Sequence, residues 1–359
     1  MSDIKLNELR DKIDEIDSEI IRLLNERAGL AQEVGSIKKA EGREFYVPSR
    51  EREVIKKVTA ANEGPFPDAA LKVIFREIMS ASLSLEEPLK VAFLGPGATF
   101  THTACIQHFG SSTQLLPQKS IGDVFDEVEK GKADYGVVPV ENSNEGMVTH
   151  TLDRFVDFSS YICGEIFLPV SHCLINSTGS FGDIKKIYSH PQAIAQCRKW
   201  LTTNAPSIPV IEVASTALAA EMAREDKSIA AIASENAATA YDLAIVESKI
   251  EDIINNVTRF IVIGDKISEK TGYDKTSLMV SVKDEPGVLY RMLESFASFG
   301  VNLTKIESRP LKKKAWEYVF FLDMEGHLED EDVKKAVSSL KERCQFMKVL
   351  GSYPRMRMP

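Results

Sequence analysis

Residues 255–263, NNVTRFIVI, place a hydroxyl and a guanidinium side by side at the start of an apolar run. Thr258 can donate a hydrogen bond, and Arg259 can hold a carboxylate. The apolar residues from Phe260 onward predict a buried strand, which would fix both groups at the edge of a cleft. The stretch therefore indicates a reaction site, whereas TRF taken alone is more typical of an ordinary strand start.

On either side of this stretch, short apolar runs alternate with helical patterns, as is typical of an α/β domain. Because TRF comes late in this order, we expect two lobes, with the chain leaving the first lobe near Gly164 and returning near Asn255. The strands are expected at residues 90–94, 135–140, 165–175, 186–188, 210–213, 228–233 and 259–263.

The beginning of the chain has the pattern of a long amphipathic helix. Apolar residues recur with spacings of three and four over residues 6–40, which predicts one helix about 52 Å long. Shorter helices are expected at residues 49–61 and 67–85, with a break at residues 62–65. Two short helices cannot cover so long an apolar stripe, so we infer that a second copy of the long helix completes an intertwined homodimer.

The end of the chain has the order strand, helix, strand, strand, helix, strand, which predicts a ferredoxin-like βαββαβ domain. These elements are expected at residues 278–282, 287–299, 303–308, 316–324, 329–341 and 346–352.

The composition argues against several classes of protein. The chain has 359 residues and a net charge of -9, enough length for two or three domains and no support for nucleic-acid binding. No apolar run approaches the roughly 18 to 20 residues that span a membrane, and the charged N-terminus predicts no signal peptide, so we expect a cytoplasmic protein. The five cysteines form no CxxC pair and the histidines do not cluster, which predicts reduced thiols and no metal site.

Several motifs in a fixed order carry a family resemblance. GPGATFTH (95–102), PVENSNEG (139–146) and YSHPQAIAQC (188–197) precede TRF, and ESRP (307–310) follows it. Together they resemble prephenate dehydratase with a C-terminal amino-acid-sensing ACT domain, and the first 86 residues resemble the all-helical chorismate mutase. The whole chain therefore resembles the bifunctional chorismate mutase/prephenate dehydratase family of phenylalanine biosynthesis.

The resemblance implies an all-α chorismate mutase domain at residues 1–87, a two-lobed α/β dehydratase domain at 89–268 and an ACT regulatory domain at 275–359. The dehydratase cleft would be of the kind seen in periplasmic solute-binding proteins. It implies that chorismate is rearranged to prephenate, which is then decarboxylated and dehydrated to phenylpyruvate. Phenylalanine would be the feedback inhibitor, and no cofactor is needed.

The mutase reaction is pericyclic, so it needs placed cations and hydrogen-bond donors rather than a nucleophile or metal. Arg27 and Lys38 lie about 20° apart around the helix and roughly 16 Å apart along it, whereas Arg10 lies about 100° from Arg27. The resemblance implies that Arg10 reaches the partner's site. The matched motifs assign catalysis to Arg27, Lys38 and Glu86, and substrate binding to Arg10, Arg50 and Ser82.

Two positions of the mutase domain depart from many relatives. Val47 stands where many have an aspartate that contacts a substrate hydroxyl, which predicts weaker chorismate binding. Glu86 stands where some have glutamine, and it can donate to the ether oxygen only when protonated. Nearby cations would lower its pKa and burial would raise it, so the sequence leaves the net direction open. For any one of these residues, a solvated charged face stays the alternative.

The dehydratase cleft must protonate a departing ring hydroxyl while leaving the ring carboxylate poorly solvated. Thr258 is expected to donate to that hydroxyl, and Arg259 to anchor a carboxylate of the substrate. The proton would come through a network for which Asn142, Gln192 and Glu141 are candidates.

Helix starts near residues 99–101, 189–191 and 215–216 would add backbone amides that bind carboxylates. The resemblance also makes Ser189, Asn142 and Gln192 substrate-binding residues. His190 is equally well explained as a helix cap.

The ACT domain carries the expected effector site. Gly287 at a helix start would let a carboxylate approach the backbone amides, and the site would lie between two paired ACT domains. Val288 replaces the usual alanine, which leaves the affinity for phenylalanine open. The resemblance assigns effector binding to Gly287, Val288, Leu289, Asn302, Glu307, Ser308, Arg309 and Pro310.

Rival interpretations stay open at this stage. The chain could be a non-catalytic amino-acid sensor, the helical domain could be regulatory, or the substrate could be arogenate instead of prephenate. The relative rates, direct passage of prephenate between sites, and pairing of the dimer into a tetramer are also undecided by the sequence.

Overall fold

The structure is a computed structural model that describes all residues except 1, 42–45, 284, 311–317, 357 and 359, and it leaves out the side chains of residues 2 and 3. The chain divides into two compact units, Met1–Leu89 with Phe109–Gln114, and Lys90–His108 with Leu115–Pro359. In the described part of the chain, no helix is both long enough and apolar enough to cross a membrane.

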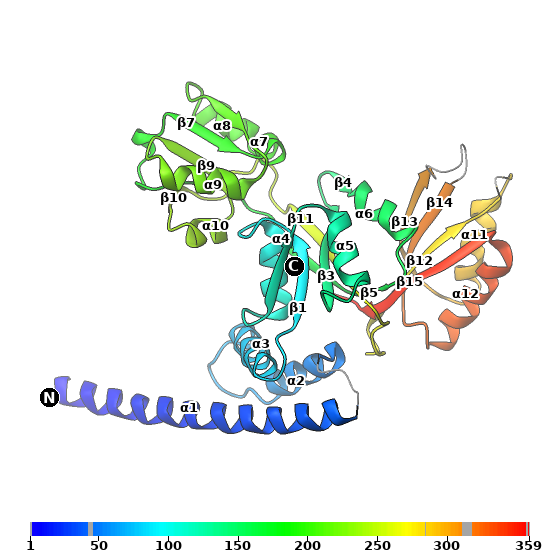
Figure 1. The fold of residues 1–359 in the computed structure, drawn as a ribbon, viewed down its shortest axis with the longest axis horizontal. Helices are drawn as coiled ribbons and strands as arrows, with labels where there is room; N and C mark the ends of the chain where they lie inside the picture. The colour runs from blue at the N-terminus through cyan, green and yellow to red at the C-terminus, as the bar shows by residue number, and fades with distance from the viewer. Residues whose placement is uncertain (1, 42–45, 284, 311–317, 357, 359) are drawn as a thin grey trace. The chain divides into compact units, whose positions relative to one another are not determined.

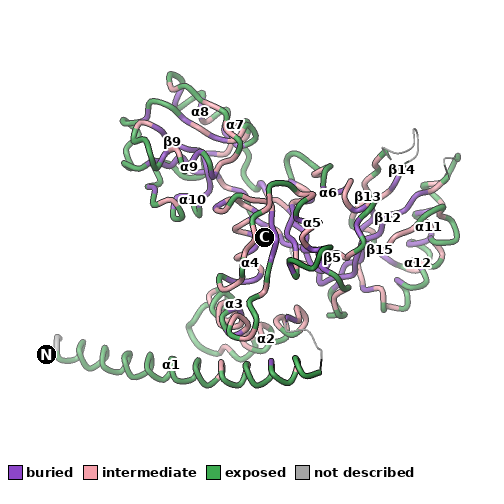
Figure 2. The backbone as a smooth tube through the Cα atoms, in the orientation of Figure 1, coloured by how far each residue is buried: buried purple, intermediate pink, exposed green. Residues whose placement is uncertain are grey.

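The first unit contains three helices, α1 (Ser2–Ala40), α2 (Pro48–Ala60) and α3 (Asp68–Ser84), which confirms the predicted helices. Proline is favoured in the first turn of a helix because its missing N–H needs no partner there, and Pro48 occupies this position in α2. The apolar stripe of α1 faces solvent along most of the helix, as Figure 2 shows. Ile16, for example, is 60% exposed.

The first lobe of the second unit is built on a six-stranded sheet in which β11 (Val257–Gly264) lies between β3 (Tyr135–Asn142) and β5 (Tyr161–Pro169), antiparallel to both (Figure 1). Phe260 to Ile263 are buried, which confirms the predicted strand after TRF. The lobe's other elements are β1 (Lys90–Leu94), α4 (Phe100–Phe109), β2 (Gln114–Gln118), α5 (Ile121–Glu129), β4 (Gly146–Met147) and α6 (Thr149–Phe155).

The second lobe is built on a five-stranded sheet of order β10-β6-β9-β7-β8. Its elements are β6 (Cys173–Asn176), η1 (Phe181–Asp183), β7 (Lys186–Ser189), α7 (Pro191–Gln196), α8 (Arg198–Asn204), β8 (Val210–Glu212), α9 (Thr216–Glu225), β9 (Ile229–Ala233), α10 (Glu235–Ala240) and β10 (Ala244–Glu247).

The two lobes are joined by two crossing segments. The predicted single strand over residues 165–175 is wrong, because β5 ends at Pro169 and the chain leaves the first lobe there rather than near Gly164. The polar residues Ser171 and His172 lie between the two strands and mark the break that the prediction passed over. The return lies near Asn255, as predicted, and the backbone N–H of Val170 donates to the carbonyl of Asn256 at 2.8 Å.

The C-terminal part has the predicted βαββαβ order and a four-stranded antiparallel sheet, β13-β14-β12-β15. Residues 316 and 317 of the predicted third strand lie outside the described residues. The elements are β12 (Asp274–Ser281), α11 (Val288–Ala297), β13 (Leu303–Pro310), β14 (Tyr318–Glu325), α12 (Glu331–Arg343) and β15 (Phe346–Pro354).

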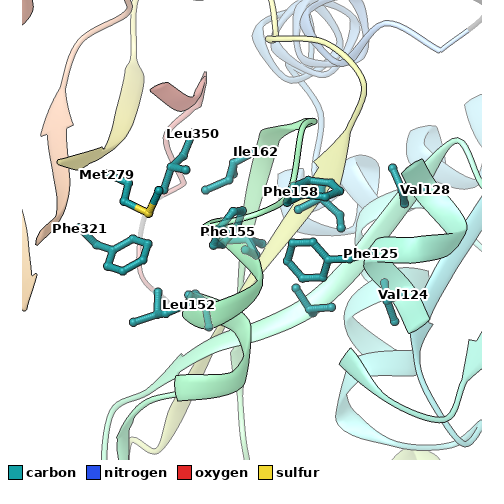
Figure 3. Close-up of a cluster of buried hydrophobic side chains, with 14 of the residues drawn as sticks. Val124, Phe125, Val128, Leu152, Phe155, Phe158, Ile162, Met279, Phe321 and Leu350 are labelled. Atoms are coloured by element: carbon teal, nitrogen blue, oxygen red, sulfur yellow. The ribbon is translucent and has the colours of Figure 1, made fainter. Parts of the chain in front are cut away.

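Strand β12 is buried at every position because both faces of this sheet are covered. Leu278 and Val280 pack with α11 and α12, whereas Met279 between them packs into the core of the first lobe. Figure 3 shows Met279 at one side of this shared cluster, with Phe125 toward the other side. The ACT part and the first lobe therefore share one apolar core.

Two candidate active sites and a candidate effector site

A cavity of about 360 Å³ lies among the three helices of the first unit. It contains the predicted residues Arg27 and Lys38 of α1, Arg50 of α2, Ser82 of α3, and Glu86 just after α3. Arg27 Nη1 donates to Ser82 Oγ at 2.9 Å, so the two groups hold each other in place. Val47 also lines the cavity and presents an apolar side chain there.

Glu86 lies directly against Gly35 of α1. A Cβ atom added to Gly35 would be only 1.8 Å from Oε2 of Glu86, so the absence of a side chain at residue 35 makes room for the carboxyl group. Burial raises the pKa of Glu86, and the charge of Lys38 opposes this only in part. The sequence left open whether the pKa of Glu86 is raised or lowered; it is raised, which favours the protonated form.

The sequence analysis missed Glu51, which lines the same cavity. Burial raises the pKa of Glu51 to about 7, against the opposing effects of Arg76 and of a hydrogen bond with Tyr46. The signal was available: Val47, Arg50, Glu51 and Val54 follow the spacing of one helix face, and all four line the cavity.

Arg10 is the predicted mutase residue that does not line the cavity. It is exposed on α1, about 25 Å along the helix from Arg27.

A second cavity, also about 360 Å³, is lined by residues of both lobes of the second unit. Thr258 of β11 and Asn142 of β3 are paired across the sheet and line it together, with Gln192 of α7. Asn142 Nδ2 donates to Thr258 Oγ1 at 2.9 Å, while its Oδ1 accepts from the backbone amides of Asn144 and Glu145. Because the oxygen of Thr258 accepts from Asn142, its hydroxyl hydrogen is available to donate to a ligand.

The network continues from Asn142 across both lobes. Asn142 Nδ2 also donates to Asn256 Oδ1 at 2.8 Å, and Asn256 Nδ2 donates to Gln196 Oε1 at 3.2 Å. Gln196 and Gln192 both donate to the carboxylate of Glu145. The network therefore joins Thr258 to the two glutamines of α7.

His172 of the first crossing segment is a further member of the network. Its Nε2 lies 2.8 Å from Gln196 Oε1, and a carbonyl oxygen can only accept, so Nε2 carries the hydrogen. Nδ1 is buried without a partner, and burial lowers the pKa of the imidazole, which favours the neutral ring. The sequence analysis missed His172, Gln196 and Asn256; Gln196 follows Gln192 by one helical turn, and Asn256 precedes Thr258 by two strand positions.

The starts of three helices also line this cleft, as expected: α4, α7 and α9. Ser215 caps α9 by accepting from the amide of Leu218 at 3.0 Å. In α7 the cap is His190, whose Nδ1 accepts from the amide of Gln192 at 3.2 Å. Ser189 does not line the cleft: it is fully buried and its hydroxyl donates to the carbonyl of Ile232 at 2.6 Å.

Arg259 and Glu141, which were also expected in the cleft, do not line it. Successive residues of a strand point to opposite faces, and Thr258 faces the cleft, so Arg259 points away from it. Its Nε donates to Glu165 at 2.9 Å and its Nη1 to Asp323 of the ACT part at 2.7 Å. Glu141 likewise lines the opposite side of the sheet. Among the described residues that line the cleft there is no lysine or arginine.

The expected effector residues of the ACT part divide between the two ends of its sheet. Ser281 and Arg309 both pair with Val319 of β14, so the ends of β12 and β13 lie together and bring the Gly287 turn toward ESRP. Gly287 has a φ of 81°, in the left-handed region that favours glycine, and caps α11, which begins at Val288.

One expected effector residue, Asn302, lies elsewhere, and the side chain of another, Arg309, contacts a different part of the chain. Asn302 precedes β13 at the other end, about 17 Å along the strand from Glu307 and about 26 Å from Pro310. Arg309 Nη2 donates to Asp153 of α6 at 2.8 Å, so this guanidinium contacts the dehydratase part.

Comparison with known proteins agrees with this arrangement. Family models match for chorismate mutase type II over residues 9–87, prephenate dehydratase over 91–268 and the ACT domain over 276–342. The bifunctional chorismate mutase/prephenate dehydratase of Aquifex aeolicus is 54% identical over 355 residues, covering 98% of each chain. That of Pseudomonas aeruginosa is 43% identical over 357 residues, again covering 98% of each.

Among solved structures, the prephenate dehydratase from Arthrobacter aurescens in complex with L-Phe is similar, with a TM-score of 0.69 and 36% identity. The match covers 74% of this chain and 90% of that chain. Fold and cavities together define a multidomain enzyme in which catalytic parts are joined to an ACT domain. Since relatives match it from end to end, the chain belongs to the bifunctional chorismate mutase/prephenate dehydratase family.

Proposed function

We propose that this protein rearranges chorismate to prephenate in the helical cavity and converts prephenate to phenylpyruvate in the two-lobed cleft. The observation that carries the proposal is the separation of two cavities with different linings. One is lined by arginine and lysine side chains, and the other by a threonine–amide network, helix starts and apolar residues.

In the helical cavity, Arg27, Lys38 and Arg50 hold the two carboxylates of chorismate in a compact conformation. The carbon–oxygen bond breaks as the carbon–carbon bond forms, and negative charge grows on the ether oxygen. Protonated Glu86 and Lys38 donate to that oxygen. The raised pKa of Glu86 supports this role, because only the protonated acid can donate.

In the cleft, Thr258 donates to the departing ring hydroxyl while Asn142 holds its oxygen. The bond to the ring carboxylate breaks and its electron pair enters the ring as the ring becomes aromatic. The hydroxyl leaves as water with the proton of Thr258, and the threonine hydroxyl regains a proton from solvent. Apolar residues such as Phe100, Val148 and Phe260 keep the ring carboxylate poorly solvated, which favours loss of CO2. The helix starts take the place of the expected arginine in holding the pyruvyl carboxylate.

The protein acts as a homodimer in which the exposed stripe of α1 packs against a second copy. Ile13, Ile16 and Ile20 are each about half exposed or more, and an apolar stripe of this length needs cover in water. Arg10, which is far from its own cavity, would then serve the cavity of the other subunit. The double substitution Ile13→Asp and Ile20→Asp should produce monomers in sedimentation and abolish mutase turnover; an active monomer would exclude this arrangement.

Phenylalanine inhibits the dehydratase by binding at the end of the ACT sheet that carries Gly287 and ESRP. The similar dehydratase from Arthrobacter aurescens was solved with L-Phe, which supports this choice of ligand. Because Asn302 lies at the other end of its own sheet, it would contribute from a paired ACT domain. Pro310→Ala should raise the phenylalanine concentration needed for inhibition while leaving uninhibited turnover unchanged.

The direct test is to supply the purified protein separately with chorismate, prephenate and arogenate. Conversion of chorismate to prephenate and of prephenate to phenylpyruvate is expected. Binding without turnover would favour an amino-acid sensor instead, and preference for arogenate would change the assigned substrate. The free cysteines, four of them buried, fit the cytoplasmic location that we propose for these reactions.

A further inference from the structure

The sheet behind the dehydratase cleft has two neighbouring residue pairs that face opposite ways. Asn142 and Thr258 form the cleft pair, with side chains joined at 2.9 Å. The adjacent residues, Glu141 and Arg259, form what we call the rear pair; they are also in register across β3 and β11. Each residue of the rear pair is thus one peptide bond from a residue of the cleft pair.

The ACT part holds both members of the rear pair through neighbouring strands. Lys305 of β13 contacts Glu141 at 2.5 Å, and Asp323 of β14 contacts Arg259 at 2.7 Å. Lys305 and Asp323 are themselves in register across β13 and β14. Two adjacent residues of the regulatory sheet therefore bind two adjacent residues of the catalytic sheet.

Arg259 is held at each of its three nitrogens. Nε donates to Glu165, Nη1 to Asp323 and Nη2 to the hydroxyl of Tyr353 at 3.0 Å. Lys275 of β12 also donates to Glu165 at 2.7 Å, so two cations face two carboxylates in a buried cluster. Such clusters contribute little net stability compared with apolar packing, but they permit few alternative geometries. The cluster is suited to fixing the position of β11.

The same strand of the ACT part carries the expected effector segment. Glu307 to Pro310 follow Lys305 on β13, only two to five positions away. A rearrangement of β13 on effector binding would reach Glu141 through Lys305 and Arg259 through Asp323, with no flexible loop between them.

We propose that the rear pair is the point at which the ACT domain controls the dehydratase, with Arg259 and Glu141 acting as positioning residues for Thr258 and Asn142. The proposal rests on the proposed function above and deepens it. A ligand on the ACT domain moves β13 and β14, the rear pair follows, and the cleft pair loses its alignment. Allostery requires only that the effector binds one of these arrangements more tightly than the other.

The test uses the full-length protein and substitutions on the regulatory side, Lys305→Gln and Asp323→Asn. The matched control is Lys270→Gln, which removes a lysine–carboxylate pair with Asp330 of the ACT part at 2.5 Å, away from the rear pair. For each variant we would measure phenylalanine binding by calorimetry and the dehydratase activity that remains at saturating phenylalanine. The activity that remains at saturating phenylalanine measures the coupling between the ACT domain and the cleft, whereas calorimetry measures phenylalanine binding.

We expect Lys305→Gln and Asp323→Asn still to bind phenylalanine, but to keep at least about 5-fold more activity at saturation than the wild type, the lower end of usual allosteric coupling. Lys270→Gln should behave like the wild type. If Lys305→Gln, whose side chain is partly accessible, keeps the wild-type activity at saturating phenylalanine while binding phenylalanine, the proposal is wrong. A wild type without phenylalanine-sensitive dehydratase activity would instead refute the proposed function.

Discussion

The two cavities enclose similar volumes, about 360 Å³ each, but they differ in the positively charged side chains that line them. The helical cavity is lined by Arg27, Lys38 and Arg50. The dehydratase cleft has no lysine or arginine among its described lining residues, which include Thr258, side-chain amides and the starts of helices.

The difference follows from where the charge is needed. In the mutase reaction negative charge grows on an ether oxygen, so cations stabilise the transition state more than the substrate. In the dehydratase reaction a carboxylate loses its charge as CO2, so a cation beside it would stabilise the substrate and slow the reaction. The position of Arg259 on the face of the sheet opposite the cleft agrees with this requirement.

The largest expected effect is on the dehydratase activity of the cleft. Thr258→Ala should lower dehydratase turnover on the order of 100-fold, the usual scale for loss of acid catalysis, because the departing hydroxyl loses its donor. Thr258→Ser keeps the hydroxyl and should recover much of the activity. Separate mutase assays should show no change; equal loss of both activities would contradict the assignment of two sites.

The mutase activity of the helical cavity should depend on pH. Burial raises the pKa of Glu86, so the donating acid is present at low pH and is lost as pH rises through that pKa. Mutase activity should fall in the same direction, by up to about 10-fold per pH unit above the pKa if only the acid is active. Glu86→Gln donates at every pH and should flatten this fall and raise the rate near pH 8.

Glu51 provides the control for this profile. Its pKa is raised to about 7, so any pH dependence that remains in Glu86→Gln should centre there and disappear when Glu51→Gln is added. The folded form disfavours the charge of Glu51, so the helical unit should also lose stability as pH rises from about 4.5 to about 7. A flat wild-type profile from pH 5 to 8 would show that Glu86 does not face the ether oxygen.

Periodicity predicted the elements of this chain better than it predicted their connections. The three helices of the first unit and the βαββαβ order of the last part follow from local spacing alone. The crossing at residues 170–172 did not, although Pro169, Ser171 and His172 interrupt the apolar residues of β5 and β6 there. Which sheet a strand joins depends on contacts distant in sequence.

The candidate sites show a similar limit. The motifs correctly predicted that Thr258, Asn142 and Gln192 line one cleft. Successive residues of a strand point to opposite faces, however, so Arg259 had to face away from Thr258. That rule was sufficient to exclude the predicted substrate contact. The partner of Arg259, Asp323, lies 64 residues further along the chain, and nothing local in either sequence indicates the contact.

A smaller effect is expected at His172, which lines the cleft and belongs to the hydrogen-bond network. His172→Ala removes the donor to Gln196 and should lower dehydratase kcat about 10-fold, the scale of one net hydrogen bond. His172→Gln can still donate near the same place and should restore most of the rate. A general loss of folding would affect KM and thermal stability in both variants, and equal defects in alanine and glutamine variants would exclude the proposed role of Nε2.

The smallest effect expected is at Gly35, where stability and activity should change in opposite directions. Alanine is favoured over glycine within a helix by about 1 kcal/mol, so Gly35→Ala should stabilise α1. The added methyl group, however, would occupy the position of the Glu86 carboxyl group, which must move because a flexible side chain yields before the helix does. Mutase turnover should then fall about 5-fold, the equivalent of roughly 1 kcal/mol or one weakened hydrogen bond. Gly29→Ala is the matched control, because no atom lies within 4 Å of a Cβ added there, and it should stabilise α1 without loss of turnover. If Gly35→Ala and Gly29→Ala have the same mutase activity, then the position of Glu86 against α1 does not matter for the reaction, and the cations alone distinguish the helical cavity from the cleft.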